Sequence, residues 1–509
     1  MKRILTALLA GLFVLMTFAA CSDSKVNSGN DANPSQTTQG QTPGATDAEG
    51  EEETRKFLDD MPETMDFQGR TVKFIATEGS NGNITELSIR AEENSGDVVE
   101  DAVFNRNLTV CDRLNVAIEL VDLFTDFSGC NEPLRTAVKS GTSDFDIAGT
   151  YQYYGIVVAA EGILFNLNNK TRFPYNDFER EYGGTQYMKS MSYDGNSYYW
   201  ATGDMALRYT GGMYVTYVNS TLFTNYYNDV NLYSVVDEGE WTVDKVSEYA
   251  SGVYQDLNGN GSKDSSDLYG FILQSNDLTD GFAAGCMVDF SSRDENGLPY
   301  LTLDNEHTYT FWEKYYALMF ENPGTMLNPS TDDSVTSMTN FSAGQFMMTC
   351  NKLYQSAIYL REMEDNFYIL PLPKLDVAQD HYNTRIHDSC TLFGVPITVS
   401  DTECISATLE ALASESAKVV TPAYYEVALK VKFTRDSDSG RMIELVHENV
   451  NIDFAAQWSN KIGNINHFFR GRADAKDTAI ASSIAKNKKV WDKSMEKLFS
   501  QLEKASEND

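Results

Sequence analysis

The sequence predicts a mixed α/β protein whose two lobes face each other across a cleft. Two observations support this. From Thr71 onward, strand-like and helix-like segments alternate with short links, which favours parallel sheets covered by helices. Within Ser197–Phe223, two β-branched and aromatic runs are expected to be strands: Tyr198–Trp200 ends the first and Met213–Val218 begins the second. They flank a glycine-rich bend that holds Asp204, Arg208 and Tyr209. We interpret this bend as a crossover between lobes; the alternative is an ordinary buried hairpin.

Composition limits the kind of partner. The 509 residues are 42% hydrophobic and 12% aromatic, which is typical of a globular protein with more than one core. The formal net charge of −34 repels nucleic acid and anionic lipid headgroups, so we expect no nucleic-acid partner and a neutral or cationic ligand. Five histidines argue against a histidine-based metal enzyme.

The N-terminus has the features of an export signal. Lys2 and Arg3 precede an uncharged run that extends to Ala20, so we expect residues 1–20 to be a secretory signal. The run ends Phe18-Ala19-Ala20-Cys21, which resembles the lipobox of bacterial lipoproteins. That resemblance implies that Cys21 is acylated and becomes the mature N-terminus. The alternative is a plain signal peptide with an incidental cysteine.

We expect residues 21–65 to be a disordered tether, because Ser22–Arg55 is polar and nearly lacks apolar residues. No later stretch has the ~18 apolar residues that a membrane-spanning helix needs. The expected attachment is therefore through lipid alone, on the extracytoplasmic face of the cell membrane. The six remaining cysteines contain no Cys-x-x-Cys pair, and they could form disulfides or remain buried thiols.

The first lobe is expected to begin with a parallel sheet. The predicted order is strand Thr71–Ala76, helix Val98–Leu114, strand Val116–Val121, helix Leu134–Lys139 and strand Phe145–Ala148. In such sheets ligands lie beyond the carboxyl ends of the strands. Glu78, Tyr151 and Tyr153 occupy such positions and are candidate ligand contacts. The alternative is that Glu78 is a surface carboxylate and that the two tyrosines pack in the core.

A calcium-loop motif follows a helix that we expect to be capped by Thr242 and to run to about Tyr254. The twelve residues from 256 to 267 match an EF-hand loop, with Gly261 at the sharp turn of position six. Position twelve is aspartate where the full pattern has glutamate. The predicted calcium ligands are Asp256, Asn258, Asn260, Ser262 through its carbonyl, Asp264 and Asp267. The alternative is a polar turn. A structural role is expected, because the following Tyr269–Leu273 resembles a strand and not a second helix.

Several later segments, together with Tyr217-Val218-Asn219 at the end of the crossover, resemble family 1 extracellular solute-binding proteins, the receptors of ABC-type sugar importers. These segments are Phe341–Thr349, Tyr368–Pro373 and Thr391–Ile397. The resemblance spans about Thr71 to Leu502 and implies a two-lobed, type II periplasmic-binding-protein-like fold. It places lobe 1 at 66–207 plus 392–440 and lobe 2 at 208–391 plus 441–509. A docked amphipathic helix is expected over Lys486–Lys504.

The resemblance implies a monomeric, non-enzymatic receptor that delivers a carbohydrate to ABC permease subunits. Sugar recognition needs aromatic planes for the CH faces and carboxylates or amides for the hydroxyl rim. The expected platforms are Tyr151, Trp200, Tyr209, Tyr354 and Trp458, and the expected rim residues are Glu78, Asp204, Asn351 and Asp388.

Two alternatives stay open at this point. A surface glycoside hydrolase would need two carboxylates ~5–10 Å apart, which 74 acidic residues neither support nor exclude. The sequence contains no Gly-x-Ser-x-Gly or His-Glu-x-x-His motif. A glycan-binding lipoprotein without a transporter would share the tether and the aromatic residues but would lack two-lobe closure. Cleavage of oligosaccharides and compaction on ligand binding would separate these hypotheses.

Overall fold

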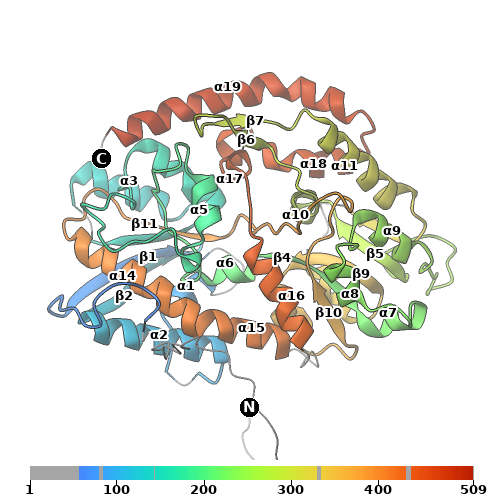
Figure 1. Cartoon of the computed structure of the whole chain (residues 1–509), viewed down its shortest axis with the longest axis horizontal. Helices are drawn as coiled ribbons and strands as arrows, with labels where there is room; N and C mark the ends of the chain where they lie inside the picture. Colours follow the sequence, from blue (N-terminus) through green and yellow to red (C-terminus); the bar gives the residue numbers. More distant parts are fainter. Residues whose placement is uncertain are drawn as a thin grey trace, which may run out of the picture. The chain divides into compact units, whose positions relative to one another are not determined.

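Two separate β-sheets, each covered by helices, form the framework of the chain (Figure 1). The computed structural model describes residues 57–78, 84–93, 95–142, 144–329, 334–430 and 437–507. All of them belong to one compact unit, Arg55–Asp509. We call the part built on the first sheet lobe 1 and the part built on the second sheet lobe 2.

The sheet of lobe 1 has the strand order β11-β3-β1-β2. Its strands are β1 (Arg70–Thr77), β2 (Val116–Phe124), β3 (Ile147–Tyr151) and β11 (Thr391–Gly394). β1 runs parallel to β2 and β3, with Phe74 opposite Leu120 and Ile147, whereas β11 runs antiparallel to β3. The carboxyl ends of β1, β2 and β3 therefore lie at one edge of this sheet.

The sheet of lobe 2 has the strand order β10-β4-β9-β5-β8. Its strands are β4 (Tyr214–Asn219), β5 (Tyr269–Gln274), β8 (Thr325–Asn328), β9 (Phe346–Lys352) and β10 (Phe367–Leu370). β5 is parallel to β8 and β9, and β4 is antiparallel to β9 and β10. A separate hairpin pairs β6 (Ser291–Arg293) with β7 (Pro299–Leu301).

The helices divide among the two lobes and the segments that join them. Lobe 1 carries α1 (Ile84–Ile89), α2 (Val98–Leu114), α3 (Asn131–Ser140), α4 (Gln152–Gly155), η1 (Ile156–Glu161), η2 (Glu181–Gly183), α5 (Thr185–Met191), α14 (Thr402–Glu415) and η4 (Ser416–Val420). Lobe 2 carries α7 (Ser220–Tyr226), α8 (Leu232–Asp237), α9 (Val243–Ser251), α10 (Asp277–Gly285), α11 (Glu306–Tyr316), η3 (Ala317–Glu321), α12 (Ser334–Ser342), α13 (Tyr354–Tyr359) and α16 (Ser437–Glu448). The remaining helices are α6 (Leu207–Gly211), α15 (Thr421–Lys430), α17 (Phe454–Gln457), η5 (Ser459–Lys461), η6 (Ile465–His467), α18 (Phe468–Asp474) and α19 (Ile480–Ser506).

The described part of the chain connects the two lobes at three places. The first passage leaves lobe 1 after Ala201, which bridges to Phe393 of β11, and reaches β4 through α6. The second passage returns beside it, because Met213 bridges to Ile386 just ahead of β11. In the third, α15 packs on α2 of lobe 1 and α16 packs on β10 of lobe 2. Residues 431–436, between those two helices, lie outside the described residues.

Most predicted elements are present, with some differences in their ends. The helix predicted over Val98–Leu114 has those bounds, because the Asp97 carboxylate caps the N–H groups of Val99 and Glu100, and Asn115 ends it in the left-handed region. Thr242 caps α9 as expected, but the helix stops at Ser251. Tyr198–Trp200 is not a strand; only an isolated bridge follows it at Ala201.

The folded part of the chain begins before residue 66. Asp59 and Arg113 form a buried two-pronged ion pair at 2.7 and 2.8 Å, and the guanidinium also lies 3.7 Å from the centroid of the Phe57 ring. Residues 57–65 are therefore part of lobe 1, and the predicted tether 21–65 extends too far. The expected signal, Cys21 and the rest of the tether lie outside the described residues.

The C-terminal segment contacts both lobes, which differs from its predicted assignment to lobe 2 alone. α19 packs on η1 of lobe 1 and on α11 of lobe 2. Its buried side chains form one apolar stripe, which confirms the expected docked amphipathic helix; they are Ile480, Ile484, Trp491, Met495, Leu498, Leu502 and Ala505. Within the described residues, we find no helix that combines the length and the apolar character needed to cross a membrane.

Candidate functional site

The candidate site lies where the carboxyl ends of strands from both sheets meet. From lobe 1, Glu78 follows β1, Phe127 follows β2, and Tyr151 ends β3. From lobe 2, Asp277 follows β5 and Lys352 ends β9. Asp388 and His387 link the two sets. The Asp388 carbonyl accepts from the Tyr153 N–H of lobe 1, the Asp388 carboxylate lies 3.5 Å from His387 Nε2, and His387 Nε2 lies 3.5 Å from Asp277 of lobe 2. The two sheet edges therefore face one common region. This is the arrangement expected of a ligand site in open α/β sheets.

A buried ion pair forms the base of the site on the side of lobe 1. Arg208, in the first passage, pairs with Glu78 at 3.3 Å, and both side chains are almost fully buried. The Tyr151 ring lies 4.7 Å from the guanidinium carbon, and its hydroxyl donates to the Glu78 carbonyl. Burial raises the pKa of Glu78 above its ordinary value, although Arg208 and the N–H groups of Ile84 and Glu86 oppose the rise. Glu78 and Tyr151 are thus held in place by the crossover itself.

A second charged cluster lies on the side of lobe 2. Asp277 accepts hydrogen bonds from Lys352 Nζ and Tyr214 Oη, both at 2.8 Å, and lies 3.5 Å from His387 Nε2. Burial alone would raise the pKa of Asp277, but Lys352, His387 and Tyr214 together hold it well below its ordinary value. Burial lowers the pKa of His387 below its ordinary value, although the Asp388 and Asp277 carboxylates oppose the change.

Tyr153 connects lobe 1 with the C-terminal segment. Its ring stacks on that of His467, with centroids 5.6 Å apart and planes 14° apart, and its hydroxyl donates to Asn464 Oδ1 at 2.8 Å. Asp388 lies beside it, because the Tyr153 N–H donates to the Asp388 carbonyl at 3.0 Å. Burial, with a smaller effect of nearby Arg470, lowers the pKa of His467 to about 4. The site therefore combines aromatic faces with a partly exposed carboxylate.

Further aromatic rings extend from Tyr153 along the edge of lobe 1. The Phe127 ring stacks on the half-exposed Tyr154 ring at 5.6 Å and also contacts Tyr151 at 5.5 Å. Tyr154 meets Tyr153 edge to face at 4.9 Å. Such rings can contact the CH faces of a sugar and also stabilise one another.

The predicted site residues fall into two groups. The first group lies in or beside the site and consists of Glu78, Tyr151, Tyr153, Asp388 and the half-buried Tyr354. Tyr354 begins α13, two residues after Lys352 at the end of β9. The others are packed elsewhere: Trp200 is 1% exposed, with its ring against Gly394 of β11, and Trp458 is 2% exposed, with its indole N–H bonded to the Met191 carbonyl at 2.9 Å. Neither tryptophan offers a free face, so the platform role predicted for them is replaced by core packing.

The other predicted contact residues, Asn351, Asp204 and Tyr209, are also buried. Asn351 is fully buried in β9, where its side-chain oxygen accepts from the Lys352 N–H. Asp204 lies 3.3 Å from His447 Nε2, and Tyr209 packs edge to face on the same histidine, so both belong to the contact between the first passage and α16. Asp204 and Tyr209 therefore hold the first passage against α16, whereas Asn351 is buried within β9.

Sequence reasoning missed Phe127, Asp277 and His467. The rule that selected Glu78 and Tyr151 would have found Phe127 and Asp277 if it had been applied to the ends of β2 and β5 as well. No local pattern indicates His467, because it reaches the site through tertiary packing of the C-terminal segment.

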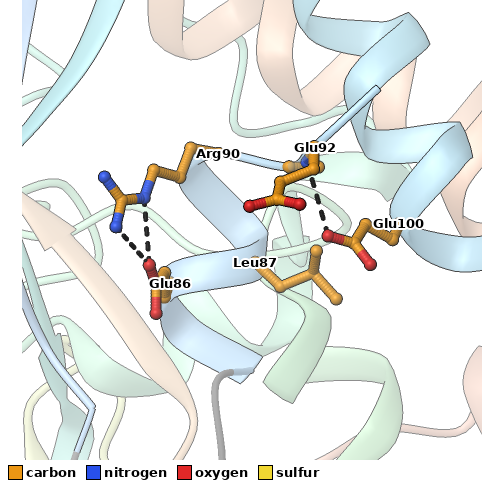
Figure 2. A pocket seen from close by; sticks show the side chains of 6 residues that line it. Glu86, Leu87, Arg90, Glu92 and Glu100 are labelled. Atoms are coloured by element: carbon orange, nitrogen blue, oxygen red, sulfur yellow. Dashed lines mark hydrogen bonds and ion pairs between the residues drawn. The ribbon is translucent and has the colours of Figure 1, made fainter. Parts of the chain in front are cut away.

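Two surface pockets lie near α1. One, of about 470 Å³, is lined by Glu86, Leu87, Arg90, Ala91, Glu92 and Glu100; its Arg90 is engaged with Glu86 (Figure 2). The other, of about 220 Å³, is mainly apolar and is lined in part by Leu87, Leu207, Tyr354 and Ile358. Tyr354 places this second pocket beside the candidate site, where it involves elements of both lobes.

The loop 256–267 is held in a compact turn by hydrogen bonds among its own residues. The Asp256 carboxylate accepts the N–H groups of Gly259 and Gly261 at 2.6 and 2.8 Å, and both glycines have positive φ. The amide groups of Asn258 and Asn260 converge on Asp264. Asp267 is buried and accepts the Leu257 N–H at 3.2 Å, and a bridge between Gln255 and Leu268 closes the loop. This oxygen-rich donor set fits a hard cation such as calcium.

The loop contains three carboxylates, those of Asp256, Asp264 and Asp267. Among the residues that the structure describes, however, no three histidine, cysteine, aspartate or glutamate side chains lie close enough together to hold a metal ion. All six cysteines in the described ranges are free thiols, and five of them are buried.

Two α/β lobes, joined by repeated chain passages and sharing one site between strand ends, define the fold of two-lobed periplasmic solute-binding proteins. Solved structures agree over nearly the whole chain. An ABC substrate-binding protein from Listeria monocytogenes, in complex with cycloalternan, aligns with a TM-score of 0.53 at 12% identity, covering 84% of this chain and 99% of that one. The GacH receptor of Streptomyces glaucescens, studied unliganded and with acarbose, gives 0.53 at 13% identity over the same shares.

A third similar structure is the galacto-N-biose-/lacto-N-biose I-binding protein of an ABC transporter from Bifidobacterium longum, with a TM-score of 0.52 at 11% identity, covering 86% and 99% of the two chains. No family model matches the sequence, and no curated protein sequence matches it. At these identities the comparison establishes the fold, which confirms the predicted α/β two-lobed architecture.

Proposed function

We propose that this protein is a lipid-anchored, extracytoplasmic solute-binding receptor that captures a carbohydrate and delivers it to an ABC importer. The observation that carries the proposal is the cluster of aromatic rings, carboxylates and basic groups where the strand ends of two lobes meet. The three similar structures are sugar-binding or ABC substrate-binding proteins of the same fold. A receptor of this kind works without catalysis and as a monomer.

The described residues suggest how a sugar would be held. Tyr153 and His467 present aromatic faces, which match the CH faces of a pyranose ring. Asp388 keeps a partly exposed carboxylate, whose two oxygens can accept hydrogen bonds from adjacent hydroxyls. The Glu78–Arg208 and Asp277–Lys352 pairs balance their own charges, which favours a neutral solute.

Calorimetric titration with mono- and oligosaccharides tests the proposal. Asp388→Asn and Tyr153→Ala should each weaken binding of the sugar that binds the wild type by at least about tenfold, since each removes one good contact. Tyr226→Ala, at an exposed ring on α7, is the matched control and should leave affinity unchanged. Binding that is unaffected by both site variants would contradict the proposed site.

Two outcomes would favour the alternative functions. Release of cleavage products from an oligosaccharide would make the protein a glycoside hydrolase. Binding without compaction in small-angle scattering would favour a glycan-binding lipoprotein that is not coupled to a transporter.

The lipid anchor is a separate part of the proposal and rests on the sequence Phe18-Ala19-Ala20-Cys21, outside the described residues. In cells fed a radiolabelled fatty acid, the wild type should acquire label and remain in the membrane fraction. Cys21→Ser should lose both properties. Labelling of the Cys21→Ser protein would place the acylation elsewhere.

We further propose that the loop 256–267 binds calcium. Asp256, Asn258, Asn260, Asp264, Asp267 and the Ser262 carbonyl would hold the ion, which would tie the end of α9 to β5. Calcium should raise the melting temperature of the wild type, and chelator should lower it again. Asp256→Ala should abolish the shift, whereas Asp294→Ala, in the β6–β7 turn, should retain it. A melting temperature that does not respond to chelator would exclude the ion.

A further inference from the structure

The C-terminal end of α5, in lobe 1, is capped by side chains that come from outside lobe 1. Gln457 donates to the Tyr187 carbonyl at 3.0 Å, and Trp458 donates to the Met191 carbonyl at 2.9 Å. Arg293 donates to the carbonyls of Lys189, Ser190, Ser192 and Tyr193, at 2.8, 3.3, 2.5 and 3.4 Å. Six carbonyls at or just after the end of one short helix thus accept hydrogen bonds from three side chains.

These three side chains supply hydrogen-bond donors to carbonyls at the C-terminal end of the helix. The last carbonyls of a helix have no partner within the helix and carry partial negative charge. A guanidinium is well suited to such a position, because its donors are fixed in a planar fork and its charge complements the helix dipole. Since Arg293 is half-buried, removing it would leave several of these carbonyls without a donor.

The three capping residues are anchored in lobe 2. Arg293 belongs to β6, and the hairpin follows α10, which packs on β5. The same hairpin holds α17, because Asp453 accepts from Ser291 Oγ at 2.7 Å and from the Phe290 N–H at 3.1 Å. Further along, Arg470 pairs with Asp280 of α10. These contacts attach the hairpin and the segment from 453 to 470 to lobe 2, and the same segment also contacts lobe 1 through Gln457, Asn460 and Asn464.

We propose that Arg293, together with Gln457 and Trp458, is a latch between the lobes, so that the two lobes separate only when the cap on α5 opens. The latch is distinct from the three covalent passages, since none of its residues lies in them.

The latch is also joined to the candidate site. Asn460, two residues after Trp458, donates to the Tyr153 carbonyl at 2.8 Å. Opening the latch would therefore move the segment that contacts Tyr153. The inference concerns lobe motion and does not depend on the identity of the solute.

The distance between the lobes tests the latch directly. Nitroxides can be attached to p-acetylphenylalanine at positions 139 and 224, which are exposed on α3 of lobe 1 and α7 of lobe 2, and measured by pulsed electron resonance. This chemistry leaves the native thiols unlabelled. Arg293→Gln should shift the distance distribution to longer values or broaden it. Arg293→Lys, which retains a charge but not the fork, should give an intermediate distribution.

The matched control is Arg135→Gln. Arg135 is also paired through its guanidinium, with Glu132 and Glu161, but both partners belong to lobe 1. The distance distribution of Arg135→Gln should equal that of the wild type. Circular dichroism checks that each variant is folded; if Arg293→Gln is not, Trp458→Phe removes one donor while keeping an aromatic ring, and it should shift the distribution in the same direction. A folded latch variant with the wild-type distribution would overturn the inference.

Discussion

At the scale of single residues, three of the buried carboxylates of this protein form specific pairs with cations. Asp59–Arg113, Glu78–Arg208 and Asp277–Lys352 each place a carboxylate against a cation at 2.7 to 3.3 Å, away from most of the solvent. Such pairs contribute little net stability compared with apolar replacements, but losing one partner leaves an uncompensated buried charge. Each pair therefore fixes the relative position of two segments more than it stabilises the fold.

Asp59→Ala tests whether residues 57–65 belong to the fold. It should lower the free energy of unfolding by about 3–5 kcal/mol, because Arg113, whose side chain is 3% exposed, would lose its carboxylate. Glu179→Ala breaks the exposed pair with Lys189 and should cost at most about 1 kcal/mol. Denaturant titration measures both. Equal small effects would show that the segment is only loosely attached.

His467 should make stability depend on pH. Its pKa is lowered to about 4 in the folded protein, mainly by burial, whereas an unfolded histidine has a pKa of about 6.5. The unfolded state therefore binds the proton first, and stability is lost as pH falls from about 6.5 to 4. In His467→Gln, the acid-induced loss of the free energy of unfolding should be smaller by about 1–2 kcal/mol. This is less than the full pKa shift of His467 implies, because water screens the partly exposed ring. The exposed His381, changed to Gln, is the control in denaturant titrations at pH 7.5 and 5. An equal acid-induced loss in wild type and His467→Gln would contradict this assignment.

Residue types alone separated positions in the candidate site from core positions only in part. Glu78, Tyr151 and Tyr153 were predictable because they follow strands, and strand ends meet at one edge of a parallel sheet. Trp200 and Trp458 have the right chemistry for a sugar platform, but whether an indole faces a cleft or a core depends on distant segments, namely β11 and α5. That information is tertiary and has no local signature.

At the scale of elements, local chemistry determined the ends of helices well. α2 has its predicted bounds because an aspartate cap precedes it and a left-handed asparagine ends it. The predicted strand at Tyr198–Trp200 failed because β-propensity reports a fit to a half-buried pleated surface, and this segment pairs only briefly with β11.

The cap of α9 gives a prediction at this scale. Thr242 accepts the Lys245 N–H at 3.2 Å, so Thr242→Ala should lower the free energy of unfolding by about 1 kcal/mol. Thr242→Ser keeps the hydroxyl and should retain most of that stability. Thermal and denaturant unfolding of the three proteins provide the comparison. If serine and alanine were equally destabilising, the lost methyl packing of Thr242 would be responsible and the cap would not.

At the scale of the whole molecule, the sequence predicted two sheets and the passages between them, but not how the C-terminal segment joins the lobes. The apolar stripe of α19 predicts that the helix docks; it does not specify the surface. In the structure this surface includes η1 of lobe 1 and α11 of lobe 2. Together with the α5 cap, α19 therefore connects the lobes without a covalent crossing.

A proline in the middle of α19 tests whether this helix makes the lobes unfold together. Lys489 is exposed and lies between the buried side chains of Ile484 and Trp491. Lys489→Pro should cost about 3 kcal/mol relative to Lys489→Ala, because proline removes a backbone donor and clashes with the preceding turn. If α19 couples the lobes, calorimetry should show one transition for the wild type and Lys489→Ala, and two for Lys489→Pro. A single transition for Lys489→Pro, shifted only in temperature, would mean that the covalent passages and the α5 cap are sufficient to couple the lobes.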